Sequence, residues 1–449
     1  MATVMARYML AVLFSMIVIS VDFGYAKFDP IAFTITMDKP HNYSQATTLS
    51  YPVTITSHMK TNSVSNGVFT SIVDGIFTCQ VYSTAFRNGK IFLDIMHNDV
   101  TVASIYAHMK DSHSSGGNVV VLHLAKDDTV KVKTRPNQNV SVFGYEQYDT
   151  FTCSQVGSES LTLNQTSIPA FSVVSDRTQK VNGGTPIKYD VKLLDVTNAF
   201  DVKSSIFTTP LAGIYIFHFY GLSMQHEELW HDMFVNEEYI CSARSKTNYE
   251  WSSTGNTVIL HLRSKDNVTI KAHVDTDSYL FGNDNQIFTS FSGVQIITDY
   301  DAQSPDIYPV VAFSVGLAKN VTIKSGQNIT FDKVFINYGN AFNMTSGLFI
   351  PPVTGVYMFN YHFRGKYPEK PIYLKLLHNE RIIGGLYSEA YGLHSTVGNA
   401  VVLNLIGGDA LRFISMDNIS LYGHPSEIHC IFSGYLLHSV NPAEIIVGK

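Results

Sequence analysis

Histidine, aspartate and cysteine are the residues of this 449-residue chain whose types suit chemistry. Its 17 histidines would suit metal binding or acid–base catalysis if they clustered at defined spacings. The chain holds no H-E-x-x-H zinc motif, no G-x-S-x-G nucleophile motif, no phosphate-binding loop and no Cys/His set at zinc spacing. The sequence therefore predicts a protein that is not an enzyme and has no metal site built from such a motif.

The histidines that recur do so in pairs. His97 and His378 follow a hydrophobic residue in "MHN" and "LHN", and His123 and His261 share "LHL". In an alternating strand successive side chains face opposite sides, so one neighbour of each such pair meets solvent. We therefore expect these histidines to be half-exposed structural residues.

Composition and charge narrow the class of partner. Charged residues are 15% of the chain and the net charge is −6, so neither a nucleic-acid footprint nor a basic membrane-binding patch is visible. The 12% aromatic content, with 25 Tyr and 28 Phe, favours β structure.

The N-terminal 26 residues have the pattern of a secretory signal peptide. Arg7 precedes the apolar run "YMLAVLFSMIVISV", and Gly24 and Ala26 stand at the small-residue cleavage positions. The alternative is a signal anchor, but the run is short for a hydrocarbon layer of about 30 Å. We expect cleavage after Ala26 and a secreted, extracellular chain with no membrane span. In such a chain the Asn-x-Ser/Thr motifs become expected glycosylation sites: Asn42, Asn139, Asn164, Asn267, Asn320, Asn328, Asn343 and Asn418.

The segments that position these residues occur as three copies along the chain. The stretch "LFIPPVTGVYMF" at 348–359 has counterparts in "IFTTPLAGIYIF" at 206–217 and a degraded "VFTSIVDGIFTC" at 68–79. Their glycines, Gly75, Gly213 and Gly355, are 138 and 142 residues apart. The starts "AFTI", "AFSV" and "AFSV" and the later "GNVVVLHL", "GNTVILHL" and "GNAVVLNL" keep nearly the same step. The chain is therefore read as domains at 30–156, 168–297 and 309–440, joined by polar linkers.

The segments within one copy predict an all-β fold. Runs of four to eight β-branched or aromatic residues, broken by turns every 8–15 residues, are typical of an antiparallel sandwich. Helical periodicity is absent beyond the signal peptide. We expect three tandem antiparallel β-sandwiches.

These motifs resemble the globular head of complement C1q, a jelly roll related to tumour necrosis factor. The third domain supplies "AFSV", "NYGNAFN", "GLFIPPVTGVYMF", "VVLNLIGGDAL" and "IFSGYLL", and the second keeps "AFSV", "NAFD", "IFTTPLAGIYIF" and "FSGV". The first domain is degenerate, with Phe77 for Tyr and Cys79 for Phe. No Gly-X-Y tract precedes it, so the collagen stalk of the complement protein is missing.

Heads of this family associate as trimers. The resemblance implies that three heads on one chain close a pseudo-threefold trimer by themselves, which the linkers favour by raising the effective concentration. Two alternatives remain open: domains strung like beads, or domains that join copies from other chains as a homo-oligomer.

The resemblance also bears on the four cysteines. Cys79 takes the place of Phe217 and Phe359, and Cys153 is aligned with Phe291 and Phe432, on strands that are neighbours in the family fold. We therefore expect a Cys79–Cys153 disulfide in an oxidising compartment. Cys241 and Cys430 are either free and buried or linked across an interface.

Three aspartates recur after the Leu-x-Leu segments: Asp128, Asp266 and Asp409. Because some family members bind calcium, one hypothesis is a calcium ligand near the trimer apex. The other is a turn former whose carboxylate accepts local backbone N–H groups. No second and third acidic residue recur beside them, which favours the turn, and we expect no cofactor.

The function hypothesis follows the resemblance. Stalkless relatives bind glycans or microbial surfaces through loops, which points to a lectin of the innate-immune type. Candidate loops are "SARSKTNYEWSSTGN" at 242–256 and "SEAYGLHSTVGN" at 388–399, where Tyr249, Trp251 and Tyr391 offer faces for sugar rings. The alternative is a structural or adhesive protein that links matrix or cell-surface proteins.

Overall fold

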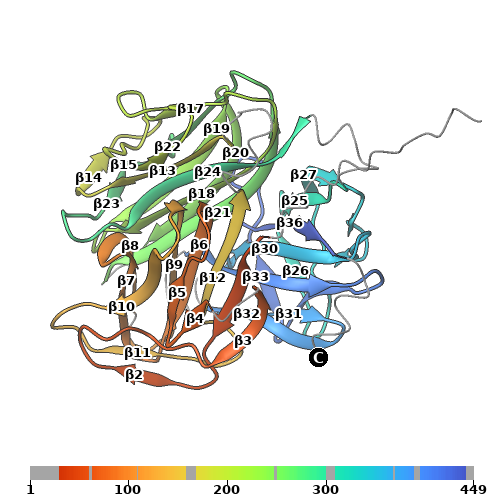
Figure 1. Ribbon diagram of the computed structural model, residues 1–449, viewed down its shortest axis with the longest axis horizontal. Helices are drawn as coiled ribbons and strands as arrows, with labels where there is room; N and C mark the ends of the chain where they lie inside the picture. Colours follow the sequence, from red (N-terminus) through yellow and green to blue (C-terminus); the bar gives the residue numbers. More distant parts are fainter. Residues whose placement is uncertain are drawn as a thin grey trace, which may run out of the picture.

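The computed structural model describes residues 30–59, 63–108, 110–157, 168–246, 250–299, 309–367, 370–388 and 395–440. The expected signal peptide and both linkers lie mainly outside these ranges. In the described part, the strands form three antiparallel β-sandwiches, coloured red to orange, green and blue in Figure 1. The expected all-β jelly-roll class is confirmed. The described residues contain no helix with the length and apolar character needed to cross a bilayer.

The first domain has two sheets. One has the strand order β2-β11-β6-β12-β1-β3, with β9 also paired to β6, and the other has the order β4-β5-β10-β7-β8. Its strands are β1 (Ala32–Thr36), β2 (His41–Tyr43), β3 (Val53–His58), β4 (Val64–Ser65), β5 (Val68–Thr70), β6 (Gly75–Ala85), β7 (Lys90–His97), β8 (Val100–His108), β9 (Ser114–Leu124), β10 (Thr129–Thr134), β11 (Val140–Val142) and β12 (Thr150–Gly157).

The second domain repeats this order. Its sheets are β14-β23-β18-β24-β13-β15, with β21 on β18, and β16-β17-β22-β19-β20. Its strands are β13 (Ala170–Ser175), β14 (Gln179–Val181), β15 (Val191–Asp195), β16 (Phe200–Asp201), β17 (Ile206–Thr208), β18 (Gly213–Ser223), β19 (Glu228–Val235), β20 (Glu238–Lys246), β21 (Ser252–Leu262), β22 (Asn267–Ala272), β23 (Ser278–Leu280) and β24 (Thr289–Thr298).

The third domain has the sheets β27-β25-β36-β30-β33 and β28-β29-β34-β31-β32, with β26 and β35 as a separate pair. Its strands are β25 (Ala312–Gly316), β26 (Val321–Ile323), β27 (Lys333–Tyr338), β28 (Phe342–Asn343), β29 (Leu348–Phe349), β30 (Gly355–Phe363), β31 (Ile372–His378), β32 (Arg381–Ser388), β33 (Val397–Leu405), β34 (Leu411–Ser415), β35 (Ile419–Leu421) and β36 (Ile431–Ser439).

The recurrent "Gly-x-Tyr-x-Phe" stretch forms the central strands β6, β18 and β30. Because side chains alternate along a strand, Phe217 and Phe359 point into their own sandwiches. The hydroxyl groups of Tyr215 and Tyr357 donate to the carbonyls of Leu211 and Val353, both at 2.6 Å, and so fix the proline turn before the strand. Phe77, at the same place in the first domain, has no hydroxyl to make this bond.

Candidate functional site

The three domains meet on the outward faces of β6, β18 and β30. Those faces contribute to one buried apolar cluster, which we call the axial cluster. Equivalent residues recur in it: Ile76, Ile214 and Val356 at one position, Ile216 and Met358 at a second, and Tyr82 and Tyr220 at a third. In Figure 1 the three sandwiches accordingly surround a common centre. Such a cluster, buried by all three domains at once, joins them into one unit.

Three rings at equivalent positions hydrogen-bond to one another within this cluster. The hydroxyl groups of Tyr82 and Tyr220 are 2.6 Å apart, and the Tyr220 hydroxyl lies 2.9 Å from Nε2 of His362. Each ring packs on the glycine of the recurrent "GN" pair on the strand beside it. A Cβ atom would lie only 2.3, 2.0 and 2.3 Å from the nearest ring atom at Gly117, Gly255 and Gly398. The glycines therefore make room for the ring of their own domain, and the rings in turn meet across the domains.

The asparagine of each "GN" pair joins one domain to the next. Asn118 Nδ2 donates to the Phe288 carbonyl of the second domain, 3.1 Å away, and Asn256 Nδ2 donates to His429 of the third, at 3.0 Å. Asn399 Nδ2 donates to the Gln147 carbonyl of the first domain at 3.1 Å, which closes the circle. The three contacts run in one rotational direction, as expected for a closed head-to-tail ring.

Apolar residues on the third strand of each sandwich repeat this cyclic pattern. Ile55 packs against the core of the third domain, Leu193 against that of the first, and Phe335 against that of the second. Each domain thus inserts a hydrophobic side chain into its neighbour. In the structure the three domains form a ring within one chain.

A polar layer that the sequence reading missed lies beside the rings. Gln80, His218 and Asn360 occupy equivalent positions and are at most 1% exposed. Burial lowers the pKa of His218 to about 3, and burial together with His218 lowers that of His362 to about 3. Both imidazoles are therefore neutral near pH 7. Aligning the repeats at this column would have revealed three polar residues where the pattern calls for apolar ones.

The recurrent aspartates are engaged within their own domains. Asp128, Asp266 and Asp409 accept the backbone N–H three residues earlier at 2.8 to 2.9 Å. Each also accepts an asparagine amide, at 2.5, 2.7 and 2.6 Å respectively. These bonds fit the turn-forming role. Among the described residues, no group of three or more His, Cys, Asp or Glu side chains is placed to hold a metal ion.

The recurrent histidines include two that support these turns. His97 Nε2 lies 3.0 Å from Asp128, and His378 Nε2 lies 3.0 Å from Asp409. His261 contacts Asp299 at 2.7 Å and is exposed. These contacts are consistent with structural roles.

Cys79 and Cys153 form a disulfide, and both are fully buried. The alignment expected for Cys153 is wrong, however. The cross-strand partner of Cys79 is Cys153, whereas that of Phe217 is Gly293 and that of Phe359 is Gly434. The aromatic residue of the last strand is retained in the first domain as Phe151. The bridge therefore replaces a phenylalanine–glycine pair, in which the glycine makes room for the ring: a Cβ at Gly293 would lie 2.6 Å from Phe217.

Cys241 and Cys430 are free and buried. Burial raises the pKa of both thiols, that of Cys430 to about 12. The sulfur of Cys430 accepts the Arg364 backbone N–H at 3.3 Å. Neither thiol has the low pKa of a nucleophile.

The expected ligand loops are only partly described. Tyr249 and Tyr391 lie outside the described residues. Trp251 is partly buried between the first and second domains, with its ring centroid 5.6 Å from that of Tyr106 and 5.7 Å from that of Phe281. Its ring therefore contributes to the domain contact, and a ligand-binding role for it stays a prediction.

A polar groove of about 580 Å³ lies next to the 242–256 loop in the second domain. Lys246 is the part of that loop that lines it, together with Asp277 and Tyr279 among others. Lys246 pairs with Glu228 at 3.0 Å, and Asp277 pairs with Lys180 at 3.1 Å, which contributes to the lowered pKa of both carboxyl groups. The groove thus holds ionised carboxylates that are paired with lysines, and the ring of Tyr279, which has the Lys180 ammonium 5.3 Å from its centroid.

The glycosylation motifs remain expectations. The described ones fall on exposed positions, apart from the partly buried Asn328, and Asn164 lies outside the described residues. The exposed ones are Asn42, Asn139, Asn267, Asn320, Asn343 and Asn418.

Comparison with known proteins matches the three sandwiches one by one. The family model described as "C1q domain" matches residues 32–153, 170–296 and 312–437. Caprin-2 of Danio rerio is 33% identical over 138 residues, which are 29% of this chain and 15% of that protein. Complement C1q tumor necrosis factor-related protein 3 of Mus musculus is 33% identical over 128 residues, 28% of this chain and 51% of that protein.

The chain therefore spans about half, or less, of these two relatives. A solved structure titled "Globular Domain of Zebrafish Complement 1qA protein" is 22% identical and covers 28% of this chain and 97% of its own, with a TM-score of 0.25. The three family matches together span most of the sequence. The chain belongs to the C1q domain family and carries three such domains in tandem.

Proposed function

We propose that this protein is a secreted, non-enzymatic recognition protein that binds glycans of microbial or cell surfaces. Its binding unit would be a ring of three different C1q domains supplied by one chain. The observation that carries the proposal is the cyclic set of contacts made by Asn118, Asn256 and Asn399, each reaching the next domain. A ring closed within one chain presents three non-identical surfaces at fixed stoichiometry.

The energetics favour closure within the chain. The linkers hold the domains at a high local concentration, roughly mM, so association needs no second molecule. The axial cluster is already complete with one copy of each domain. A second chain would have to displace a tethered partner to join.

The groove at Lys246, Asp277 and Tyr279 is the described surface best suited to a sugar. Carboxylates accept hydrogen bonds from hydroxyl groups, and a tyrosine face packs on the apolar side of a sugar ring. The equivalent surfaces of the other domains differ in sequence, so each ring would carry one such groove.

Secretion is supported by the signal-peptide pattern of residues 1–26 and by the buried disulfide, which is typical of oxidising compartments. The sequons on exposed positions fit the same compartment.

Sedimentation tests the ring. A deglycosylated secreted chain should sediment as a compact monomer near its 49.9 kDa mass, less any cleaved leader. A trimer or larger oligomer of chains would contradict closure within one chain.

A glycan array followed by titration tests the ligand. We expect binding that is lost in Tyr279→Ala and Asp277→Asn but kept in Tyr367→Ala, an exposed tyrosine of the third domain. Absence of glycan binding at high micromolar protein would contradict the lectin role. Equal binding by all the variants would place the site elsewhere.

A further inference from the structure

A groove of about 480 Å³ lies between the first and second domains, and we call it the seam groove. Its walls are the outward face of β7, β8 and β10 in the first domain and residues 285–286 of the second. The Ser104 N–H donates to the Ile287 carbonyl at 2.5 Å, and the Ile287 N–H donates to the Ser104 hydroxyl at 3.2 Å, which holds this loop against β8. Apart from the buried Asp94 and Thr134, the lining residues are partly or fully exposed, so a ligand can reach them.

The floor of the seam groove combines apolar and charged side chains. Phe92 and Met96 alternate along β7 with residues of the buried core, so they face the groove. Lys133 on β10 is the cross-strand neighbour of Asp94 on β7 and faces the same side. Arg135 follows two residues later and also lines the groove. Such a floor suits a ligand that has both an apolar and a charged part.

Asp94 is the carboxylate among the lining residues, and it is already engaged. It is 7% exposed, accepts the Ser104 hydroxyl at 2.6 Å and accepts Arg135 Nε at 2.8 and 3.1 Å. The guanidinium carbon of Arg135 lies 4.7 Å from the centroid of the Phe92 ring. Within the described part of the chain, the two terminal amino groups of Arg135 have no hydrogen-bond partner. They remain available to an anion.

Lys133 supplies a second cation without a partner. The equivalent Lys271 of the second domain binds the carboxylate of Glu237. In the first domain the equivalent carboxylate, Asp99, binds Lys131 instead, at 2.6 Å. Among the described residues, Lys133 therefore makes no ion pair. With two cations and one carboxylate, the lining of the groove carries a net charge of +1 near pH 7.

The second domain brings no carboxylate to these cations. Two residues before the carbonyl that accepts the "GN" asparagine amide, the first and third domains carry Glu146 and Glu427, but the second carries Gln286. Glu146 accepts Nζ of Lys375 at 3.1 Å and the Tyr373 hydroxyl at 2.7 Å, so that contact between domains has its own carboxylate. Gln286 is neutral and leaves the charge of the seam groove uncompensated.

We propose that the seam groove binds a small organic monocarboxylate with an apolar body. The carboxylate accepts hydrogen bonds from Lys133 and from the terminal amino groups of Arg135, and so takes the role that Glu146 has at the other contact. The apolar body lies on Phe92 and Met96. The groove has the volume of an ordinary small-molecule site, and its single net positive charge suits one carboxylate.

The seam groove is separate from the proposed glycan groove. It lies between two domains and shares no lining residue with the groove at Lys246. Failure of the glycan array would leave it standing, and its own failure would leave the proposed function standing.

Fluorine NMR tests the proposal on the deglycosylated intact chain, because the sequon at Asn139 follows Gln138 of the groove. The probes are 4-(4-fluorophenyl)butanoate and its primary amide, which have similar shapes but differ in charge. We expect saturable binding of the acid with a dissociation constant on the order of 1 mM or below. The amide should bind about tenfold more weakly or worse, since it loses the charge-assisted hydrogen bonds.

Two variants locate the site. Lys133→Gln should weaken binding of the acid by about tenfold, because it removes one cation. Gln286→Glu introduces the carboxylate that the other domains carry and should weaken binding by a similar factor. The controls make the same charge changes at exposed positions outside the groove: Lys126→Gln and Gln327→Glu should bind like the wild type.

Four results would overturn the proposal. They are lack of saturable binding of the acid, equal binding of acid and amide, and unchanged binding in both Lys133→Gln and Gln286→Glu. The fourth is displacement of the acid by acetate at the same concentration, which would reduce the site to a simple anion contact.

Discussion

The first and third domains have equivalent strands in the same order along the chain, yet they fill their interiors differently. The third domain packs Phe359 over Gly434 and Phe342 over Phe313. The first has a disulfide in place of the former pair and Val64 in place of Phe342. The face that meets the other domains differs much less, because the first domain keeps its axial ring and its "GN" pair.

The difference teaches which contacts tolerate change. A sandwich interior needs volume and apolarity, which a covalent bridge and smaller residues also satisfy. The contact between domains needs a glycine under a ring and an amide that reaches a particular carbonyl, as at Gly117 and Asn118. Those directional requirements leave fewer substitutes.

Removing the disulfide, which only the first of these two domains has, should have the largest effect on stability. Cys79→Ala with Cys153→Ala frees a loop of 74 residues, which costs about 4 kcal/mol in the chain-entropy model. Chemical denaturation with and without reductant measures this, with Cys430→Ala as a control that keeps the bridge. Reductant should destabilise the wild type and have no further effect on the double variant. A wild type indifferent to reductant would show that the bridge does not support the first domain.

Low pH should lower the stability of the protein through His218 and His362. These histidines of the second and third domains lie at the axis, where the first domain has no histidine. The pKa of His218 and His362 is about 3 in the folded chain, against about 6.5 when unfolded, so the unfolded chain binds more protons between these values. The free energy of unfolding should therefore fall as pH drops from 6.5 toward 3, by up to about 1.4 kcal/mol per unit for each histidine.

The residues of the first domain provide the matched variants for this test. His218→Gln and His362→Tyr introduce the equivalents of Gln80 and Tyr82 and should reduce the pH dependence of denaturation, leaving the part due to the buried His231, whose pKa burial also lowers to about 3. His424→Gln, at an exposed site, should leave it unchanged. An equal slope in all of these proteins would contradict the role of the axial histidines.

The smallest expected effect on stability comes from the tyrosine of each "Gly-x-Tyr-x-Phe" strand. Tyr357→Phe and Tyr215→Phe each remove a bond to a carbonyl in the proline turn and should cost about 1 kcal/mol. Phe77→Tyr is the reverse change in the first domain and should gain less, since its turn lacks the proline. Unfolding free energies from denaturant titration would rank the three. A stabilising Tyr357→Phe would refute the assigned role of the hydroxyl.

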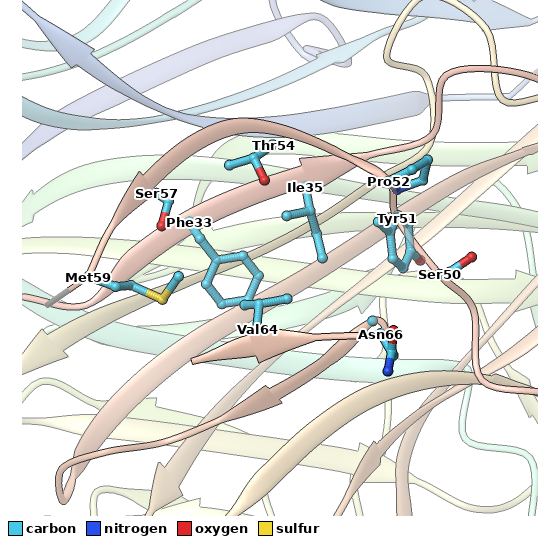
Figure 2. A pocket seen from close by; sticks show the side chains of 11 residues that line it. Phe33, Ile35, Ser50, Tyr51, Pro52, Thr54, Ser57, Met59, Val64 and Asn66 are labelled. Carbon is cyan, nitrogen blue, oxygen red and sulfur yellow. The ribbon is translucent and has the colours of Figure 1, made fainter. Parts of the chain in front are cut away.

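Much of the architecture was predictable because it depends on local pattern. The repeat spacing identified the domains, and alternation along "GIYIFHFY" and "GVYMFNYHF" identified core strands. The disulfide partners were predicted, but the column of Cys153 was wrong by two residues, because "FTC" and "FSG" align only when Phe151 is matched with Phe291. A pocket of about 370 Å³ between β1, β3 and the β4–β5 hairpin of the first domain (Figure 2) was not predictable, since the tight Asn66–Gly67 turn shifts Val64 into register with Phe69.

The sequence by itself determined the sandwiches, their number and the chemistry of their turns, because period-two patterning and turn residues act over a few positions. The tertiary structure decided which residues meet across domains. Tyr82, Tyr220 and His362 are 138 and 142 residues apart, and only the packing of three complete sandwiches brings their rings together. The same packing turned Trp251 toward Tyr106 and buried His218, because the environment of a side chain depends on what covers it.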